Sequence, residues 1–164
     1  MVRLVLVPLD GSDCAERALG PASCLARQVG ASLLLLRAAP DYTLPAGPEY
    51  PLTRSVEEST AYLNRIRQRL VDSGLTVHIE VTTHDPSAAI PLTASLRGAD
   101  MIAMCAHGHS GLRPAVGSVA QQVLRSTQLP VLLTSGRDGA TSPSAFRSLL
   151  IPLDGTAFAE EALR

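Results

Sequence analysis

The sequence contains no lysine, and all 14 of its lysine-or-arginine positions are arginine. A Walker-type phosphate loop needs its lysine, and so does Schiff-base chemistry, so both are excluded. The formal net charge is −1 and the arginines form no basic cluster. Electrostatics therefore offer no reason to expect nucleic acid or an acidic membrane as a partner.

The sequence also has few cysteines. There are three, an odd number, and they are scattered without a Cys-x-x-Cys pair: Cys14, Cys24 and Cys105. This pattern predicts free buried thiols and argues against a disulfide framework or a zinc site. No apolar run approaches the roughly 18 residues that a membrane helix needs. Met1 leads directly into an apolar run without a signal-peptide pattern, which predicts a soluble, cytoplasmic protein.

Apolar runs and helical patterns alternate along the chain. Short runs rich in Val and Leu predict buried strands, and apolar positions at helical spacing predict helices between them. A proline-rich loop at residues 40–51 is expected to cover a site. The predicted strands span residues 4–9, 32–38, 75–82, 101–106 and 131–133, and the helices span 13–29 with a kink at Gly20-Pro21, 54–71, 86–97 and 118–125. Such alternation indicates a parallel sheet covered on both faces by helices.

A glycine-rich turn joins the fourth predicted strand to the last helix. It contains His107-Gly108, Gly111 and Gly117-Ser118-Val119. Backbone N–H groups at the start of a helix can converge on an anion there. His107 and His109 alternate with Cys105, so a transition-metal site is a weaker alternative.

The C-terminal residues repeat the N-terminal ones at a constant offset of 144 positions. The matching pairs are Pro8 and Pro152, Leu9 and Leu153, Asp10 and Asp154, Gly11 and Gly155, Ala15 and Ala159, Glu16 and Glu160, Ala18 and Ala162, and Leu19 and Leu163. This predicts one domain over residues 1–135, a linker over 136–146, and the first strand and half-helix of a second repeat over 147–164. Three alternatives stay open for the unpaired strand: it lies at the interface of a homodimer, it exchanges between the two protomers, or it is the disordered end of a truncated tandem protein.

Three segments resemble the universal stress protein family: the Val7 to Ser12 turn, the strand from Asp100 to Gly108, and Gly117-Ser118-Val119 with Val123-Leu124. The resemblance implies a three-layer α/β/α sandwich. Its five-stranded parallel sheet has the order 3-2-1-4-5, as in adenine nucleotide alpha-hydrolase-like folds. It also implies a dimer, and one branch of the family binds ATP through Gly-x2-Gly-x9-Gly-Ser/Thr.

That branch implies a nucleotide-binding site in the crevice at the carboxyl ends of the first and fourth strands. Phosphates would meet the amides of Gly117, Ser118 and Val119. Asp10 would accept a hydrogen bond from ribose or assist a phosphate-bound Mg²⁺, and Ala38 would line the adenine pocket. The full set of expected binding residues is Pro8, Leu9, Asp10, Ala38, Cys105, His107, Gly108, Gly111, Gly117, Ser118 and Val119.

The sequence departs from that pattern at two places. Cys105 stands at the position of the first glycine, and eight residues rather than nine separate Gly108 from Gly117. Three functions therefore stay open: an ATP-binding regulatory module in stress response, a dimerisation module without nucleotide, and a weak ATPase. Asp10 has an alternative role as a turn or capping residue, and no catalytic residue is assigned.

Overall fold

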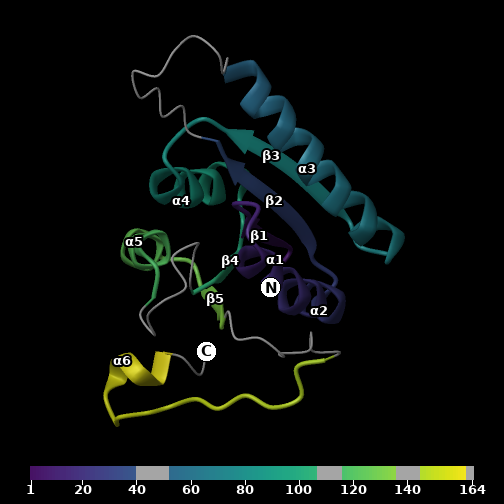
Figure 1. Ribbon diagram of the computed structural model, residues 1–164. Helices are drawn as coiled ribbons and strands as arrows, with labels where there is room; N and C mark the ends of the chain where they lie inside the picture. The colour runs from purple at the N-terminus through teal and green to yellow at the C-terminus, as the bar shows by residue number, and fades with distance from the viewer. Residues whose placement is uncertain (40–51, 107–115, 136–144, 162–164) are drawn as a thin grey trace.

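The computed structural model describes residues 1–39, 52–106, 116–135 and 145–161. Five parallel strands form one sheet in the order β3-β2-β1-β4-β5. The strands are β1 (Leu4–Pro8), β2 (Ser32–Ala38), β3 (Val77–Thr82), β4 (Met101–Cys105) and β5 (Val131–Thr134). The order and the parallel direction confirm the predicted fold class (Figure 1).

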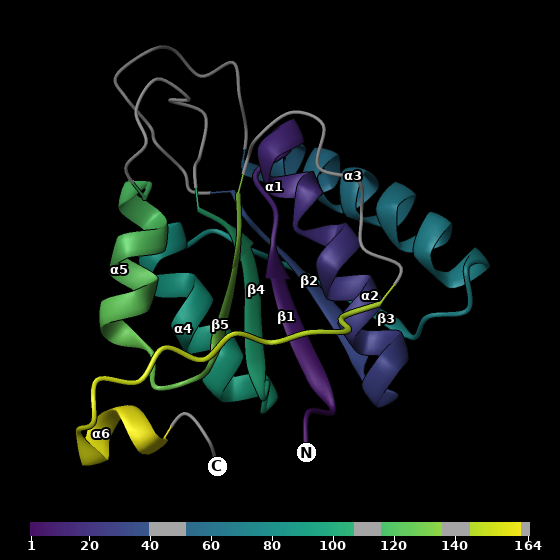
Figure 2. The same cartoon turned by 90° about the horizontal axis from the view of Figure 1, so that it is seen from below.

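Helices cover both faces of the sheet, as Figure 2 shows. One face carries α1 (Asp13–Arg17), α2 (Leu19–Val29) and α3 (Leu52–Asp72), and the other carries α4 (Pro86–Arg97) and α5 (Ser118–Ser126). Among the described residues, no helix is both long and apolar enough to cross a membrane.

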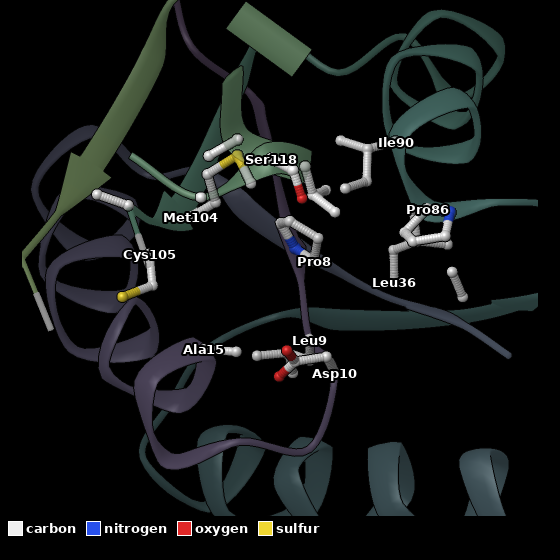
Figure 3. Close-up of a pocket in the computed structure, with 15 residues that line it drawn as sticks. Pro8, Leu9, Asp10, Ala15, Leu36, Pro86, Ile90, Met104, Cys105 and Ser118 are labelled. Atoms are coloured by element: carbon white, nitrogen blue, oxygen red, sulfur yellow. The ribbon is translucent and has the colours of Figure 1, made fainter. Parts of the chain in front are cut away.

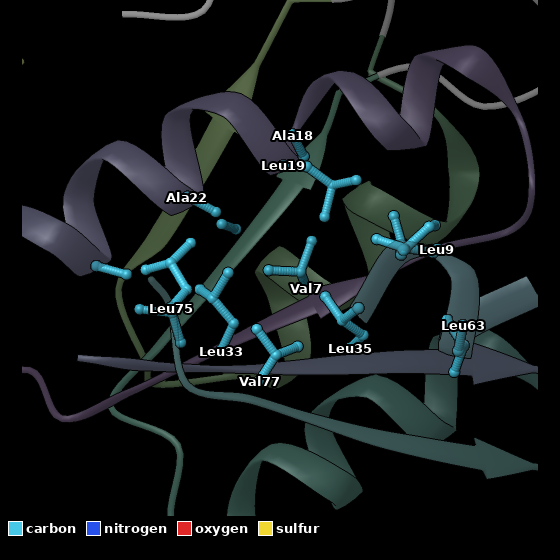
Figure 4. Close-up of a cluster of buried hydrophobic side chains, with 14 of the residues drawn as sticks. Val7, Leu9, Ala18, Leu19, Ala22, Leu33, Leu35, Leu63, Leu75 and Val77 are labelled. Atoms are coloured by element: carbon cyan, nitrogen blue, oxygen red, sulfur yellow. The ribbon is translucent and has the colours of Figure 1, made fainter. Parts of the chain in front are cut away.

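Strand residues alternate between two hydrophobic clusters because successive side chains point to opposite faces of a sheet. Val5 and Val7 pack with α1, α2 and α3, whereas Leu6 between them packs with α4 and α5. The same alternation runs along β2 through Leu33 to Leu36, all at most 1% exposed. Figure 4 shows the first cluster, with Val7, Leu33 and Leu35 facing Ala18, Leu19 and Ala22. Near-continuous apolar strands are thus explained by burial on both faces.

The first helical segment breaks at Ala18 and not at the predicted Gly20-Pro21. Pro21 has no N–H to donate to the carbonyl four residues earlier, at Arg17, and its ring would clash with that carbonyl. The break therefore lies on the N-terminal side of the proline. Pro21 is then in the first turn of α2, where a missing N–H is tolerated.

Asp100 fixes the start of the central strand. Its Oδ2 accepts hydrogen bonds from the backbone N–H groups of Arg3 (2.7 Å) and Leu4 (3.1 Å), and its own N–H donates to the Leu4 carbonyl (2.9 Å). The two backbone hydrogen bonds hold the pKa of the Asp100 carboxyl below its ordinary value. The carboxylate thus joins the beginnings of β1 and β4.

A depressed folded-state pKa makes this contribution depend on pH. It is fully present above the unfolded-state pKa of about 3.9 and is lost as the pH falls through the lower folded-state value. Asp100→Asn should therefore lower the urea midpoint at pH 6, and its difference from the parent chain should shrink between pH 5 and pH 3. A difference that stays constant over this range would contradict the assignment.

The predicted C-terminal strand is wrong. Residues 145–156 form no strand, and Leu149 and Leu150 are 84% and 91% exposed. Phe146 is held at its backbone by Gln28, which accepts from its N–H (3.0 Å) and donates to its carbonyl (3.3 Å). The segment runs outside the helix layers to α6 (Ala157–Glu160), in yellow in Figure 1. The segment has the composition of a strand, but it pairs with none of the described strands.

Candidate functional site

A cavity of about 310 Å³ opens at the carboxyl ends of β1 and β4. The chain winds outward from β1 to β3 on one side and continues with β4 and β5 on the other, so this is the point where the winding reverses. Ligands of open α/β folds bind at such points. The lining residues are Pro8, Leu9, Asp10, Ala15, Leu36, Ala38, Pro86, Ile90, Met104, Cys105, Ala106, Gly117, Ser118, Val119 and Ala120 (Figure 3).

Eight of the eleven residues expected at a binding site lie around this one cavity: Pro8, Leu9, Asp10, Ala38, Cys105, Gly117, Ser118 and Val119. The other three, His107, Gly108 and Gly111, lie outside the described residues, as does the expected lid at 40–51. Segments from four separate parts of the sequence thus converge on one hollow.

Sequence reasoning missed four large apolar residues of the cavity. Leu36, Pro86, Ile90 and Met104 line it, with Pro86 and Ile90 coming from the first turns of α4. Leu36 could have been found, because it precedes Ala38 by two positions on β2 and so points to the same face. The α4 residues could not, because only tertiary packing brings that helix to the cavity.

Asp10 is the only charged side chain among the described lining residues. It is exposed, and its Oδ1 accepts from the Ser12 N–H (2.9 Å) and the Ser12 hydroxyl (2.5 Å). Ser12 is the N-cap of α1 and accepts from the Ala15 N–H (3.1 Å). Asp10 therefore orders the turn into α1 and also presents a carboxylate at the cavity.

The same turn recurs where the sequence repeats. Oδ1 of Asp154 accepts from the Thr156 N–H (2.9 Å) and hydroxyl (2.7 Å), and Gly155 has φ +81° where Gly11 has φ +85°. These bonds hold the pKa of the Asp154 carboxyl below its ordinary value. Because none of the residues of this second turn lines the cavity, the turn is a local property of Asp-Gly-Ser/Thr, and only its location distinguishes Asp10.

The start of α5 forms the wall opposite Asp10. Gly117 is the N-cap, with φ −61° and ψ 155°, and its N–H donates to the Ala106 carbonyl at 2.6 Å. The expectation that the Gly117 amide faces an anion is therefore wrong for this conformation. The amides of Ser118 and Val119, which follow, have no acceptor within the helix because they belong to its first turn.

Cys105 lines the cavity and forms a disulfide with Cys14. The prediction of three free thiols is therefore wrong for this pair, and only Cys24 is free among the described cysteines. The partners lie 91 positions apart, so no local motif could reveal them. They meet because β1 and β4 are neighbours and α1 begins just beyond the end of β1.

Arg37 supports the turn that carries Asp10. Its guanidinium stacks on the Tyr62 ring at 4.6 Å from the centroid, and its Nη1 lies 2.9 Å from the place where a Cβ on Gly11 would be. The Tyr62 hydroxyl donates to Glu16 at 3.0 Å. Burial, reinforced by this hydrogen bond, raises the pKa of Tyr62 well above its ordinary value. Arg37 thus fills the space beside Gly11.

Gly11→Ala should destabilise the protein for two reasons. At φ +85° a Cβ costs about 1–2 kcal/mol, and it would also push Arg37 off Tyr62, where the stacking contributes about 0.5–1 kcal/mol. Gly30→Ala is the matched control, because Gly30 has φ +73° with open space around it. In urea unfolding, Gly11→Ala should lose more stability than Gly30→Ala, and Arg37→Ala should remove the excess. Equal losses would contradict the contact.

Comparison with known proteins identifies the chain. Residues 1–135 match the Universal stress protein family. The chain belongs to this family. Universal stress protein MJ0531 of Methanocaldococcus jannaschii is 28% identical over 139 residues, which cover 81% of this chain and 82% of that protein. The solved structure of the hypothetical protein MJ0577 has a TM-score of 0.75 at 26% identity, and covers 85% of this chain and 99% of its own.

Two further solved universal stress proteins share the fold at lower identity and contain nucleotides. One, in complex with cAMP, has a TM-score of 0.65 at 22% identity, over 81% of this chain and 97% of that one. The other, from Archaeoglobus fulgidus in complex with dAMP, has a TM-score of 0.61 at 21% identity, over 81% and 97%. Both ligands are adenine nucleotides.

Proposed function

We propose that this universal stress protein binds an adenine nucleotide, ATP above all, and acts as a regulatory module in stress response. The observation that carries the proposal is the cavity between the carboxyl ends of β1 and β4, with Asp10 on one wall and the start of α5 on another. The cAMP and dAMP complexes of relatives with the same fold add support.

The lining suits the three parts of a nucleotide. Pro8, Leu36, Ala38 and Ile90 give an apolar slot for the flat base. A carboxylate without a lining cation beside it would repel phosphate, so Asp10 suits a ribose hydroxyl, which donates a hydrogen bond. The neutral N–H groups at the start of α5 suit the phosphates.

Mg²⁺ fits this arrangement only as a companion of the phosphates. Among the described residues, no group of three His, Cys, Asp or Glu side chains could hold a metal ion. Mg²⁺ usually keeps several waters and takes one or two carboxylates together with substrate phosphates. Asp10 is the one carboxylate among the described lining residues, so it would take this role in place of its role at the ribose, and the ion would neutralise phosphate charge near it.

The proposal is tested on freshly purified protein. Acid denaturation followed by nucleotide chromatography should release an adenine nucleotide, and calorimetry should detect ATP binding with and without Mg²⁺. GTP is the control for the base, because guanine carries more polar groups than adenine and an apolar slot would leave them without hydrogen-bond partners. If no nucleotide is released and no heat of ATP binding is detected, the proposal is wrong. Phosphate release measured in the same samples separates a nucleotide sensor from a weak ATPase.

Dimerisation is the second candidate role, and it is compatible with the first. Supporting it are β5, which pairs with β4 on one side only, and the exposed Leu149 and Leu150. An unpaired strand edge and exposed leucines are surfaces that a second copy could cover. We expect a homodimer by light scattering, and a shift toward monomer when residues 146–164 are deleted. An unchanged dimer would remove the C-terminal segment from the interface.

A further inference from the structure

We propose that Cys14 and Cys105 form a redox-active site that takes glutathione-class disulfides and thiols, and that its oxidised state favours nucleotide binding in the adjoining cavity. The coupling rests on the proposed function, whereas the thiol chemistry does not. Cys14 lies in α1 and is partly exposed, and Cys105 ends β4 and is 7% exposed. Their Cα atoms are 6.1 Å apart, within the usual range for a disulfide of about 4.4–6.8 Å.

The disulfide joins two walls of the cavity. Cys14 lies four residues after Asp10 and directly before Ala15, and both of those residues line the cavity. Cys105 precedes Ala106, whose carbonyl accepts from the Gly117 N–H at 2.6 Å. One covalent link therefore connects the Asp10 turn, through β4, to the start of α5. A link that holds both walls reduces the ordering required when a ligand binds.

The position of the Cys105 sulfur gives a second reason for the coupling. In Figure 3 this sulfur points toward α1 and away from the space between Pro8 and Ser118. Reduction breaks the bond to Cys14 and frees the Cys105 thiol to rotate about χ1, so the sulfur is no longer fixed on the side of α1. The oxidised state thus holds this sulfur in one place, at the position where the family pattern has glycine.

The exchange balances with glutathione alone. The Cys14 thiolate attacks glutathione disulfide: a Cys14–glutathione S–S bond forms, the glutathione S–S bond breaks and one glutathione thiolate leaves. The Cys105 thiolate then attacks the Cys14 sulfur, forms the Cys14–Cys105 bond and expels the second glutathione thiolate. Two protein thiols are oxidised, one glutathione disulfide is reduced, and the two thiol protons pass to the two glutathione thiolates. Cys14 is the entry point because it is the more exposed partner.

Coupling must be reciprocal. If the oxidised form binds ATP about tenfold more tightly, saturating ATP stabilises the disulfide by the same factor. For this two-electron couple, a factor of ten lowers the reduction potential by about 30 mV. The ratio of ATP affinities and the shift in reduction potential are measured independently, and they must agree.

The test uses the full chain equilibrated at a series of ratios of reduced to oxidised glutathione. The samples are unfolded in urea with iodoacetamide, which also reaches the buried Cys24, and the trapped thiols are counted by mass spectrometry, with and without ATP. ATP affinity is measured by calorimetry at the two extremes. We expect one trapped thiol, Cys24, in the oxidised form and three in the reduced form. We also expect about tenfold tighter ATP binding when oxidised, and a midpoint about 30 mV lower with ATP.

Two variants serve as controls. Cys24→Ser should leave the affinities and the midpoint unchanged, because Cys24 lies in α2, is 3% exposed and does not line the cavity. Cys14→Ser should bind ATP as the reduced parent chain does under all conditions. The reduced parent chain itself shows that any loss is due to the disulfide and not to misfolding of a variant.

Three outcomes would overturn parts of the account, and they are distinguishable. Three trapped thiols at every glutathione ratio would overturn the redox site. Equal ATP affinity in the two states would overturn the coupling alone. An absence of ATP binding in both states would overturn the proposed function and the coupling with it, while thiol trapping would still report on the redox site.

Discussion

Gly117→Val is expected to weaken ATP binding by about 100-fold or more, equivalent to about 2.7 kcal/mol or more. The cause is steric: Gly117 lines the cavity directly before the first turn of α5, and a branched side chain would occupy the space through which phosphates reach the Ser118 and Val119 amides. The fold should survive, because φ −61° and ψ 155° suit any residue. The N–H to Ala106 hydrogen bond can therefore persist.

Ser118→Ala is the graded control for that variant. It removes a hydroxyl donor but leaves the backbone amides, so a loss of only about 5- to 10-fold is expected, as for one ordinary hydrogen bond. Calorimetry gives both affinities, and circular dichroism verifies that both variants are folded. If Gly117→Val binds ATP as the parent chain does, the start of α5 is not where phosphate binds.

Leu6→Ala should have the largest effect on stability, a loss of about 2–5 kcal/mol. Leu6 is 0% exposed in the central strand, with β2 and β4 on either side, and it packs in the cluster under α4 and α5. Truncation removes buried methyl groups and leaves a cavity that the neighbouring strands cannot close. The free energy of unfolding of a domain is about 5–15 kcal/mol, so this loss is a large fraction of the total stability.

Leu96→Ala is the matched control, because Leu96 is a leucine of α4 that is 75% exposed. Its loss should stay within about 0.5 kcal/mol, as for most surface substitutions. Urea unfolding followed by circular dichroism measures both variants. Similar losses of stability for Leu6→Ala and Leu96→Ala would show that Leu6 is wrongly assigned to the hydrophobic cluster under α4 and α5.

Much of the fold could be predicted because local patterns and burial agree. The run from Leu33 to Leu36 predicts a strand buried on both faces, and this is what β2 is. The alternation of strands and helices predicts a parallel sheet, but it does not specify the strand order. That order came from the resemblance of the Asp10 turn and the Gly117-Ser118 segment to a family.

The failures share a physical cause, which is dependence on tertiary contacts. Leu149 to Leu153 has the composition of β1, but a strand needs a partner edge as well as a composition, and none of the described edges pairs with it. The Cys14–Cys105 pairing needs β1 and β4 to be neighbours. The hydrogen bond from Gly117 to Ala106 needs the start of α5 to return to the end of β4.

The candidate site divides in the same way. Pro8, Leu9 and Asp10 are consecutive, so their presence at the end of β1 followed from the strand assignment. Pro86 and Ile90 come from a helix whose sequence carries no sign of a ligand, and packing alone brings them to the cavity. A sequence pattern can thus indicate the residues that lie at strand ends more readily than those that packing brings from another helix.

A crystal structure of the protein grown with ATP and Mg²⁺ tests the central claim most directly. We predict density for the base against Ala38 and Pro8, a ribose hydroxyl within hydrogen-bonding distance of the Asp10 carboxylate, and phosphates at the Ser118 and Val119 amides. Density for ATP elsewhere on the molecule, or none in this cavity at saturating ATP, would contradict it.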